Sequence, residues 1–214
     1  MASIAEKIVE IKVLQGIRPG CDRLLEGAFK LRHRVFVDEK RWEDLRKPDG
    51  REVDQFDGPQ CIYVLALERN SVIGHMRMTP TTHPHLLADV HGHLCARPEP
   101  RGPAIWEWTR YCVQPLKRGR SKWGEVAARV QLAGMEWLFM HGVRDVVVEY
   151  NPKFIDRHLE MGFEVNLLGL PVEMEGEQVV AVHMRFDFST LYQTRACLGV
   201  PGPILMTEPI AATA

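Results

Sequence analysis

Two strand-like runs separated by three polar residues constrain the fold more than any other part of the sequence. The runs are Cys61–Glu68 and Val72–Thr79, and apolar residues dominate both. Runs of this length and composition, bounded by polar turn residues, favour β-strands. The connection Arg69-Asn70-Ser71 is short enough for a tight turn, so the sequence predicts a β-hairpin.

The rest of the chain alternates between helical and strand patterns. Apolar residues at helical spacing predict one helix over 22–38 and a second, strongly amphipathic helix over 121–141. The other expected elements are a strand at 8–14, strands at 105–113 and 146–150, a short helix at 152–161, and strands near 163–168 and 178–187. This order predicts an α/β fold, a three-layer αβα sandwich with a mixed sheet.

The length of the chain fits one domain. No repeat, linker or low-complexity block interrupts the 214 residues. We therefore expect a single domain over 1–214, with a proline-containing tail from about Gly199 that is loosely ordered. The polar segment 41–59 has no predicted element of its own, and long connections of this kind are often functional.

Charge and cysteine content argue against several classes of protein. The net charge of −1 lacks the strongly basic character of nucleic-acid-binding proteins. The five cysteines form no Cys-x-x-Cys pair, which argues against a disulfide framework and a structural zinc site. No segment approaches 18 consecutive apolar residues, so we expect no membrane insertion and a cytoplasmic protein.

Ionisable and aromatic residues gather in three clusters. These are Arg32, Phe36 and Trp42; Asp54 and Asp57; and the strand residues Trp106-Glu107-Trp108-Thr109-Arg110. A spacing of four places Arg32 and Phe36 on one helical face. Alternation along the strand places Glu107 and Thr109 on one face of the sheet, and the two tryptophans with Arg110 on the other. Arg77 adds an isolated charge within an apolar strand, which requires a partner or water.

Each cluster also has a purely structural interpretation. The arginines suit structural ion pairs, the tryptophans suit core packing, and the two aspartates suit loop capping. Four closely spaced histidines raise the question of a metal site: His83, His85, His91 and His93. No cysteine or carboxylate accompanies them at a compelling ligand spacing, so we expect surface-loop histidines and no metal.

Taken together, the clusters resemble the acyl-homoserine-lactone synthase family of quorum-sensing bacteria. The resemblance comprises Arg32-x3-Phe36-x5-Trp42, Asp54-x2-Asp57, Gly74-x2-Arg77, Pro80-Thr81-Thr82 and Trp106-Glu107-x2-Arg110. The matching residues lie within 25–115. In the rest of the chain, the resemblance is limited to the order of the predicted helices and strands.

The resemblance implies a fold similar to the GNAT acyltransferases, with the two substrates meeting in a cleft of the sheet. It also implies transfer of an acyl group from a thioester to the amine of S-adenosylmethionine, followed by lactone closure with release of methylthioadenosine. Both molecules are substrates, so no cofactor is expected. Residues 48–52 and 106–110 resemble the branch that uses coenzyme A, which favours acyl-CoA over acyl carrier protein as donor.

The chemistry of these substrates suggests roles for the clustered residues. An aromatic face attracts a sulfonium cation, and arginines pair with carboxylates. The candidates for binding S-adenosylmethionine are Arg32, Phe36, Trp42, Arg77 and Trp108. The catalytic candidates are Glu107 as first choice of base, Asp54 and Asp57 as second choices, and Arg110 beside them. The candidates for the phosphates of the donor are Arg118, Arg120 and Ser121, at the start of the second long helix.

Two other functions remain open from the sequence. An ordinary GNAT-type N-acetyltransferase that uses acetyl-CoA would share the element order, but it would not need Arg32, Trp42 and both aspartates together. A small-molecule-binding regulator on the same scaffold would bind S-adenosylmethionine without releasing methylthioadenosine.

Overall fold

The predicted hairpin lies within a sheet whose strands come from the whole length of the chain. The computed structural model describes residues 9–17, 22–115 and 124–205. The strands are β1 (Glu10–Gln15), β2 (Ile62–Glu68), β3 (Ser71–Pro80), β4 (Ile105–Val113), β5 (Asp145–Tyr150), β6 (Glu164–Leu167), β7 (Val172–Met174) and β8 (Glu177–Arg185). Their order in the sheet is β1-β2-β3-β4-β5-β8-β6, and β7 pairs with β8. Within these ranges β4 and β5 are the parallel pair, and the other pairs are antiparallel.

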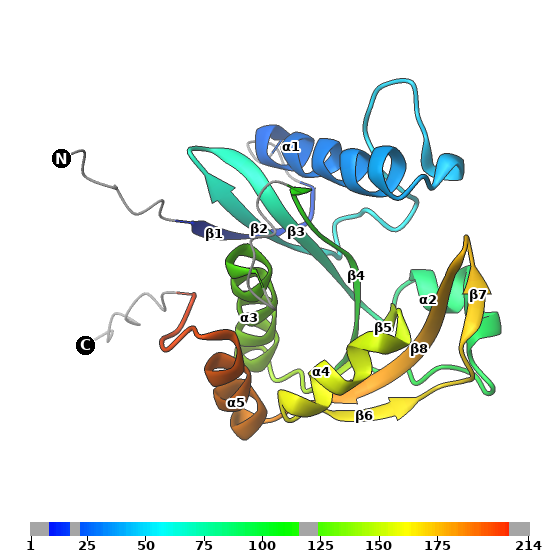
Figure 1. Ribbon diagram of the computed structural model, residues 1–214, viewed down its shortest axis with the longest axis vertical. Coiled ribbons are helices and arrows are strands. Elements are labelled where there is room, and N and C mark those ends of the chain that lie inside the picture. The colour runs from blue at the N-terminus through cyan, green and yellow to red at the C-terminus, as the bar shows by residue number, and fades with distance from the viewer. Residues whose placement is uncertain (1–8, 18–21, 116–123, 206–214) are drawn as a thin grey trace.

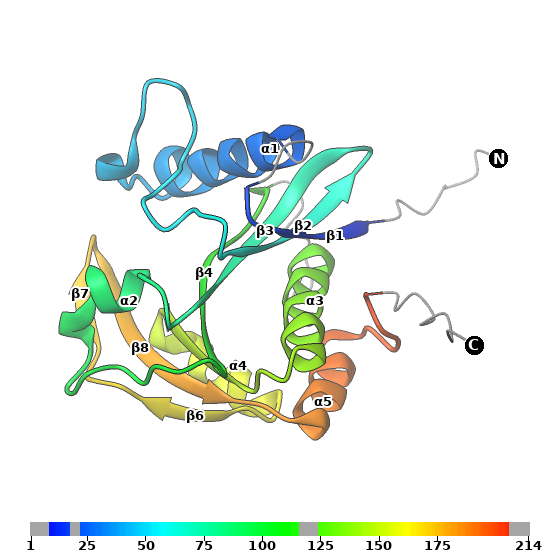
Figure 2. The same cartoon turned by 180° about the vertical axis from the view of Figure 1, so that it is seen from behind.

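Helices cover both faces of the sheet (Figures 1 and 2). The α-helices are α1 (Asp22–Arg32), α2 (Leu86–Asp89), α3 (Glu125–Met140), α4 (Ile155–Glu160) and α5 (Phe188–Leu198). A π-helical turn over His33–Glu39 extends α1, and 3-10 turns lie at Glu43–Leu45, Gly92–Leu94 and Pro152–Phe154. The views show α1 on one side of β2 and β3, and α3 on the other side with α5 next to it.

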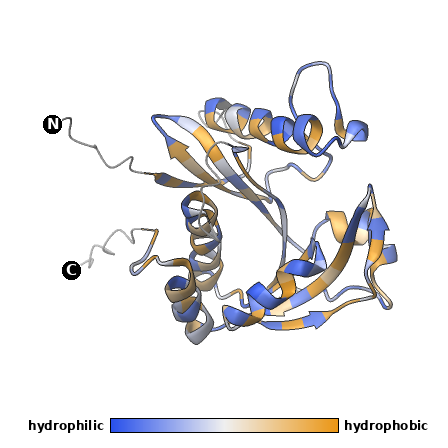
Figure 3. Ribbon diagram, in the orientation of Figure 1, coloured by the Kyte–Doolittle hydropathy of each residue, from blue (hydrophilic) through white to orange (hydrophobic). Residues whose placement is uncertain are grey.

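The two faces of β2 explain why its sequence is apolar throughout. Val64 and its alternate neighbours pack towards α3, whereas Leu65 and its alternate neighbours pack towards α1. A strand covered on both faces has no solvent side that could favour polar residues. Helix α3 is itself mostly buried, and Figure 3 colours it mainly towards the hydrophobic end of the scale.

Glycine allows α3 to lie close to β3. A Cβ atom at Gly74 would lie 2.9 Å from Val126 and 3.1 Å from Val130, which is closer than ordinary van der Waals contact. The first turns of α3 therefore lie directly over the start of β3, next to the end of β4, because Gly74 pairs with Val113.

The sheet divides into two halves where β4 and β5 separate. These strands pair only over Ile105–Trp108 and Asp145–Val148. Beyond this point β5 continues along β8, while β4 continues along β3. We call the place just beyond Trp108 and Val148 the fork. Figure 1 shows β1–β3 on one side of it and β5, β8 and β6 on the other.

A bulge in β4 accompanies the fork. Arg77 pairs with Thr109, but His75 pairs with Cys112, so two residues of β4 lie opposite the single residue Met76. Arg110, the first of the two, has a positive φ of 52°. An extra residue of this kind bends the strand and strengthens its twist. His75 bonds the carbonyl oxygen of Arg110 through Nδ1 at 2.8 Å, which holds the bulge.

The structure confirms the α/β fold class and most predicted elements. The first helix spans the predicted range once its π-helical turn is included, while the second begins at Glu125 within the described residues. The short elements α2 and β7 were not predicted. None of the described helices is long and apolar enough to cross a membrane.

The prediction for the C-terminal region needs correction. The last strand ends at Arg185, and α5, which follows it, was not predicted. The segment that follows α5 is anchored, because the buried side chain of Glu136 accepts hydrogen bonds from the backbone N–H groups of Ile204 and Leu205. Two residues of the tail that was expected to be loosely ordered from Gly199 thus bond to α3.

Candidate active site

A buried ion network joins α1, the polar segment and the sheet on the α1 side. Arg32, at the end of α1, bonds both oxygens of Asp57 at 2.8 and 2.9 Å and also bonds Glu52. Arg77 on β3 bonds Asp54 at 2.5 and 3.0 Å and lies 3.0 Å from Asp57. Both arginine side chains are fully buried.

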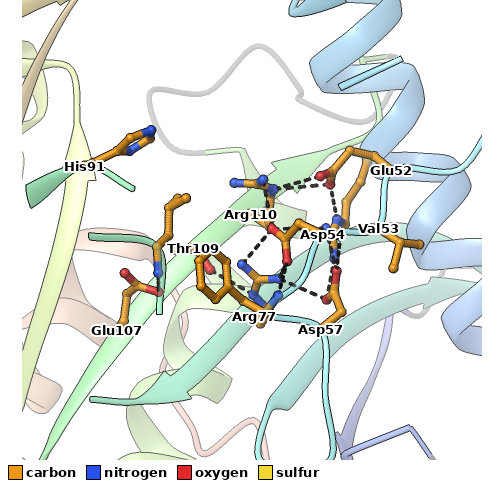
Figure 4. A network of polar contacts seen from close by, with 12 residues as sticks. Glu52, Val53, Asp54, Asp57, Arg77, His91, Glu107, Thr109 and Arg110 are labelled. Atoms are coloured by element: carbon orange, nitrogen blue, oxygen red, sulfur yellow. Dashed lines mark hydrogen bonds and ion pairs between the residues drawn. The ribbon is translucent and has the colours of Figure 1, made fainter. Parts of the chain in front are cut away.

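Arg110 completes this network from β4 (Figure 4). Its guanidinium lies 3.2 Å from Glu52 and 2.9 Å from Asp54. Simple alternation predicted that Arg110 would share a face with Trp106 and Trp108, and that prediction is wrong because the bulge shifts the alternation by one residue. Three arginines thus face three carboxylates. We call these six residues the arginine–carboxylate network: Arg32, Arg77, Arg110, Glu52, Asp54 and Asp57.

Electrostatics favour the ionised forms of Asp57 and Glu52 in this network. Burial alone would raise the pKa of Asp57, but the charges of Arg32 and Arg77 outweigh it and hold that pKa well below its ordinary value. The same balance, with Arg32 and Arg110 as the cations, lowers the pKa of Glu52. A carboxylate held this strongly in its ionised form is a poor proton acceptor. Asp57 therefore suits an organising role better than the role of second-choice base.

The π-helical turn places an aromatic pair beside the network. Phe36 and Trp42 stack with their ring centroids 5.2 Å apart and an interplanar angle of 9°. The wider turn is closed by hydrogen bonds from Lys40 N to the Val35 carbonyl and from Trp42 N to the Phe36 carbonyl, both at 3.0 Å. Phe36 is buried, and the Arg110 guanidinium lies 5.8 Å from its ring centroid.

A hollow opens on the polar segment next to this pair. It has a volume of about 330 Å³ and reaches two members of the network, Glu52 and Asp54. The other residues that line it are Asp44, Leu45, Lys47, Val53 and Gln55. The segment 41–59, which had no predicted element, thus combines one 3-10 turn, a hollow and three buried or partly buried carboxylates.

Comparison with known proteins assigns the family. The sequence model described as autoinducer synthase matches residues 21–194. The chain is 37% identical over 187 residues to an isovaleryl-homoserine lactone synthase of Bradyrhizobium diazoefficiens, covering 87% of this chain and 84% of that protein.

This chain belongs to the autoinducer synthase family. It is also 28% identical to an acyl-homoserine-lactone synthase of Pseudomonas aeruginosa, over 72% of this chain and 75% of that one. Among solved structures, the CoA-dependent acyl-homoserine lactone synthase BjaI with SAM and isopentyl-CoA superposes with a TM-score of 0.82 at 35% identity, covering 91% and 92% of the two chains. An N-acetyltransferase from Lactobacillus plantarum, with a TM-score of 0.53 and 21% identity, shares the fold.

In this autoinducer synthase, Glu107 lies on β4 two residues before Thr109, which bonds Arg77 of the network, and it pairs with Thr79. Its side chain is buried and accepts hydrogen bonds from the backbone N–H groups of Leu86, at 3.2 Å, and Leu87, at 2.7 Å. It therefore holds the first turn of α2 against the sheet. Burial raises the pKa of Glu107, which makes it a stronger base than a free glutamate.

Trp108 is separated from the other predicted residues of the S-adenosylmethionine site. It pairs with Met78 and packs against Phe163 and Phe186 in the core on the α3 side. The sheet therefore stands between its ring and the network. Arg118, Arg120 and Ser121 lie outside the described residues.

Three residues of this site had no role predicted from the sequence: Glu52, a member of the network, and Tyr63 and Thr109, which bond to it. Tyr63 donates a hydrogen bond to Asp57 at 3.2 Å, and Thr109 accepts one from Arg77 at 3.1 Å. Tyr63 and Thr109 could have been found from the pairing of the strands, because Tyr63, Arg77 and Thr109 lie side by side across β2, β3 and β4. In the described parts of the chain, no three or more His, Cys, Asp or Glu residues form a group that could hold a metal ion.

Proposed function

We propose that this chain is an acyl-homoserine-lactone synthase that transfers an acyl group from acyl-CoA to the α-amine of S-adenosylmethionine and then closes the lactone. The observation that carries the proposal is the position of the arginine–carboxylate network and the aromatic pair, next to the fork and on one face of the sheet. The likeness to BjaI, solved with SAM and isopentyl-CoA, supports the same pair of substrates.

The network side of the sheet suits S-adenosylmethionine. The stacked Phe36–Trp42 pair attracts cations, since the Lys40 ammonium lies 4.9 Å from the Trp42 ring centroid, and a sulfonium that takes this position would gain about 0.5–2 kcal/mol. The ammonium and carboxylate groups of the methionyl part match Asp54 and Arg110, two members of the network whose side chains are partly exposed. Because the network already satisfies its own charges, its geometry is in place before the substrate arrives.

The proposed acyl transfer needs a base near the amine. A free α-amine has a pKa of about 7.7–8.0 and is mostly protonated at neutral pH. Only the neutral amine attacks the thioester carbon, and the nitrogen must lose a further proton as the amide forms. Glu107, with its raised pKa, is our candidate for taking that later proton, directly or over one water. Lactone closure then requires mainly that the carboxylate be folded back onto the γ-carbon.

The donor side of the proposal rests on the fork and on the start of α3. A hollow of about 440 Å³ lies at the start of α3, between Gly124, Glu125 and Arg129 on one side and the segment 196–201 on the other. A helix N-terminus and an arginine both favour phosphate groups. We propose that the donor enters from this end with its thioester in the fork. The described cysteines are free thiols, which fits the cytoplasmic location that we also propose.

Product analysis tests the proposed function. The purified chain would be incubated with S-adenosylmethionine and a panel of straight, branched and aryl acyl-CoA thioesters, and the products identified by mass spectrometry. We expect an acyl-homoserine lactone and an equal amount of methylthioadenosine. Acyl transfer to other amines without methylthioadenosine release would instead indicate an ordinary N-acyltransferase.

Replacing Trp42 with alanine is expected to weaken S-adenosylmethionine binding by about tenfold, because it removes one aromatic face from the sulfonium. Binding of the acyl-CoA should change little, since Trp42 packs against the end of α1 and its π-helical turn, and α1 and α3 lie on opposite sides of the sheet. Calorimetry with each substrate measures both effects. Trp42→Phe keeps an aromatic face and should retain most of the affinity; unchanged affinity in Trp42→Ala would assign this residue to packing alone.

The enzyme is expected to prefer an acyl-CoA to the same acyl group on acyl carrier protein. Carrier proteins are usually acidic, so an enzyme that docks one benefits from a broad basic face, and this chain has a net charge of −1. The measurement is kcat/KM for one acyl group on both carriers at fixed ionic strength. A clear preference for the carrier protein would contradict the assignment of the donor.

A further inference from the structure

The proposed acyl transfer removes two protons from one nitrogen. S-adenosylmethionine arrives mainly as an ammonium ion, which must lose a proton before it can attack. A second proton leaves as the C–N bond forms, while the C–S bond breaks and the thiolate takes up one proton. Glu107 offers an acceptor for the second proton. The first proton can be lost to solvent, but near pH 7 an enzyme base with a pKa close to that of the amine would keep more of the bound amine neutral.

His91, one of the four histidines expected in surface loops, pairs with a carboxylate near Glu107. Nδ1 of His91, in the turn after α2, lies 2.6 Å from Oε2 of Glu149 on β5. An ionised carboxylate only accepts hydrogen bonds, so Nδ1 carries the hydrogen and Nε2 keeps its lone pair. This is the arrangement by which a carboxylate orients an imidazole for use as a base.

The pair lies on the network face, at the fork. Trp108 pairs with Val148, so Glu149 is the first residue of β5 beyond the last paired position. Glu107 pairs with Val147, which shares a face of the sheet with Glu149 two residues later. In Figure 4 the ring of His91 projects from its loop on the side of the sheet that carries Glu107 and Arg110.

The carboxylate of Glu149 lacks one partner. Its Oε1 atom is buried and makes no hydrogen bond, although its side chain as a whole is 11% exposed. A buried carboxylate oxygen without a donor is unfavourable, and none of the described residues donates a hydrogen bond to this one. An ammonium group brought to the fork would supply donors to this oxygen.

We propose that His91, oriented by Glu149, takes the first proton from the α-ammonium group of the amine substrate and so creates the nucleophile. This inference rests on the proposed function and deepens it. The N–H bond breaks, Nε2 gains the proton, and the nitrogen lone pair becomes free to attack the thioester. His91 then returns its proton to solvent, which its side chain reaches because it is 23% exposed.

The charges around His91 support this role. The hydrogen bond to Glu149 is the largest influence and raises the pKa of His91 above its ordinary value, which brings it closer to that of the amine. Glu107 on β4 acts in the same direction, whereas burial and the charge of Arg110 oppose it. His93, from the same turn, meets the ring edge-on at 6.0 Å.

The test compares His91→Phe with wild type across pH. The base must be neutral, so wild-type activity should fall as the pH drops through the raised pKa of His91. Without His91, the amine's own ionisation governs the rate. We expect kcat/KM for S-adenosylmethionine to be about tenfold lower near pH 7, where about one tenth of the amine is neutral, and within about twofold of wild type near pH 9.

Two further variants make the result specific. His93→Phe changes an exposed neighbour in the same turn and should leave the whole profile unchanged. Glu149→Gln keeps an acceptor for Nδ1 but removes the charge, so it should show a smaller loss confined to the acid side. Thermal denaturation and calorimetry with S-adenosylmethionine establish that each variant is folded and binds its substrate.

The outcomes separate this inference from the proposed function. A loss near pH 7 that is recovered near pH 9 supports His91 as the base. A loss of the same size at both pH values, or none near pH 7, overturns the inference, and so does a Glu149→Gln profile equal to wild type. Absence of acyl-homoserine lactone from the wild-type reaction would instead overturn the proposed function.

Discussion

Replacing Arg32 with methionine is expected to lower the free energy of unfolding by about 3–5 kcal/mol, the usual penalty for breaking a buried ion pair from one side. The variant should also fail to bind S-adenosylmethionine. Methionine fills much of the same space, but it leaves Asp57 and Glu52 without the cation that both carboxylates contact. Denaturant titration measures the first effect and calorimetry the second.

Arg46→Met is the matched control for this prediction. Arg46 also bonds two carboxylates, Glu43 and Asp38, but these groups are exposed. Exposed ion pairs contribute about 0–1 kcal/mol, so the control should unfold almost as wild type does. Equal stability of the two variants would show that the arginine–carboxylate network does not hold α1 to the sheet.

Glu107→Gln is expected to reduce acyl transfer by about 10²–10⁴-fold, the range of a general base. A glutamine cannot take the proton released as the amide forms. It also keeps only one accepting oxygen for the N–H groups of Leu86 and Leu87, so the start of α2 should loosen locally. The measurement is kcat at saturating substrates, with circular dichroism to compare folding.

Glu136→Gln separates the two consequences of that substitution. Glu136 is also a buried carboxylate that accepts backbone N–H bonds, but it lies on α3 and anchors Ile204 and Leu205. Its substitution should reduce stability and leave acyl transfer intact. Activity of Glu107→Gln within about threefold of wild type would remove Glu107 from the mechanism, because a general base contributes far more.

Local periodicity was sufficient to predict most of the fold. The hairpin was predicted from two continuous apolar runs around a short polar turn, and the first helix from apolar residues at helical spacing. Helix α5 lacks such a stripe, since its buried residues are Thr190, Leu191 and Thr194. Its start was still readable, because Asp187 and Thr190 form a capping box.

The spacing of residues in the sequence predicted part of the candidate site, but not the contacts that depend on strand pairing. Pairing between the arginines and the aspartates was one of two roles considered, and the structure shows it. The position of Arg110 was wrong because one extra residue in β4 reverses the side-chain alternation that follows. The contact of His91 with Glu149 spans 58 residues and depends on sheet register, which no local pattern reveals.

The fork also provides an internal reporter of substrate binding. Beyond Trp108, β4 pairs with β3 but no longer with β5 in the described structure. Alternate backbone amides of β4 therefore face the opening between β4 and β5. Amides on an open strand edge exchange their hydrogens with solvent much faster than those within a ladder. Deuterium uptake over residues 109–113 should therefore slow when a donor fills the opening, and it would register occupancy without any turnover.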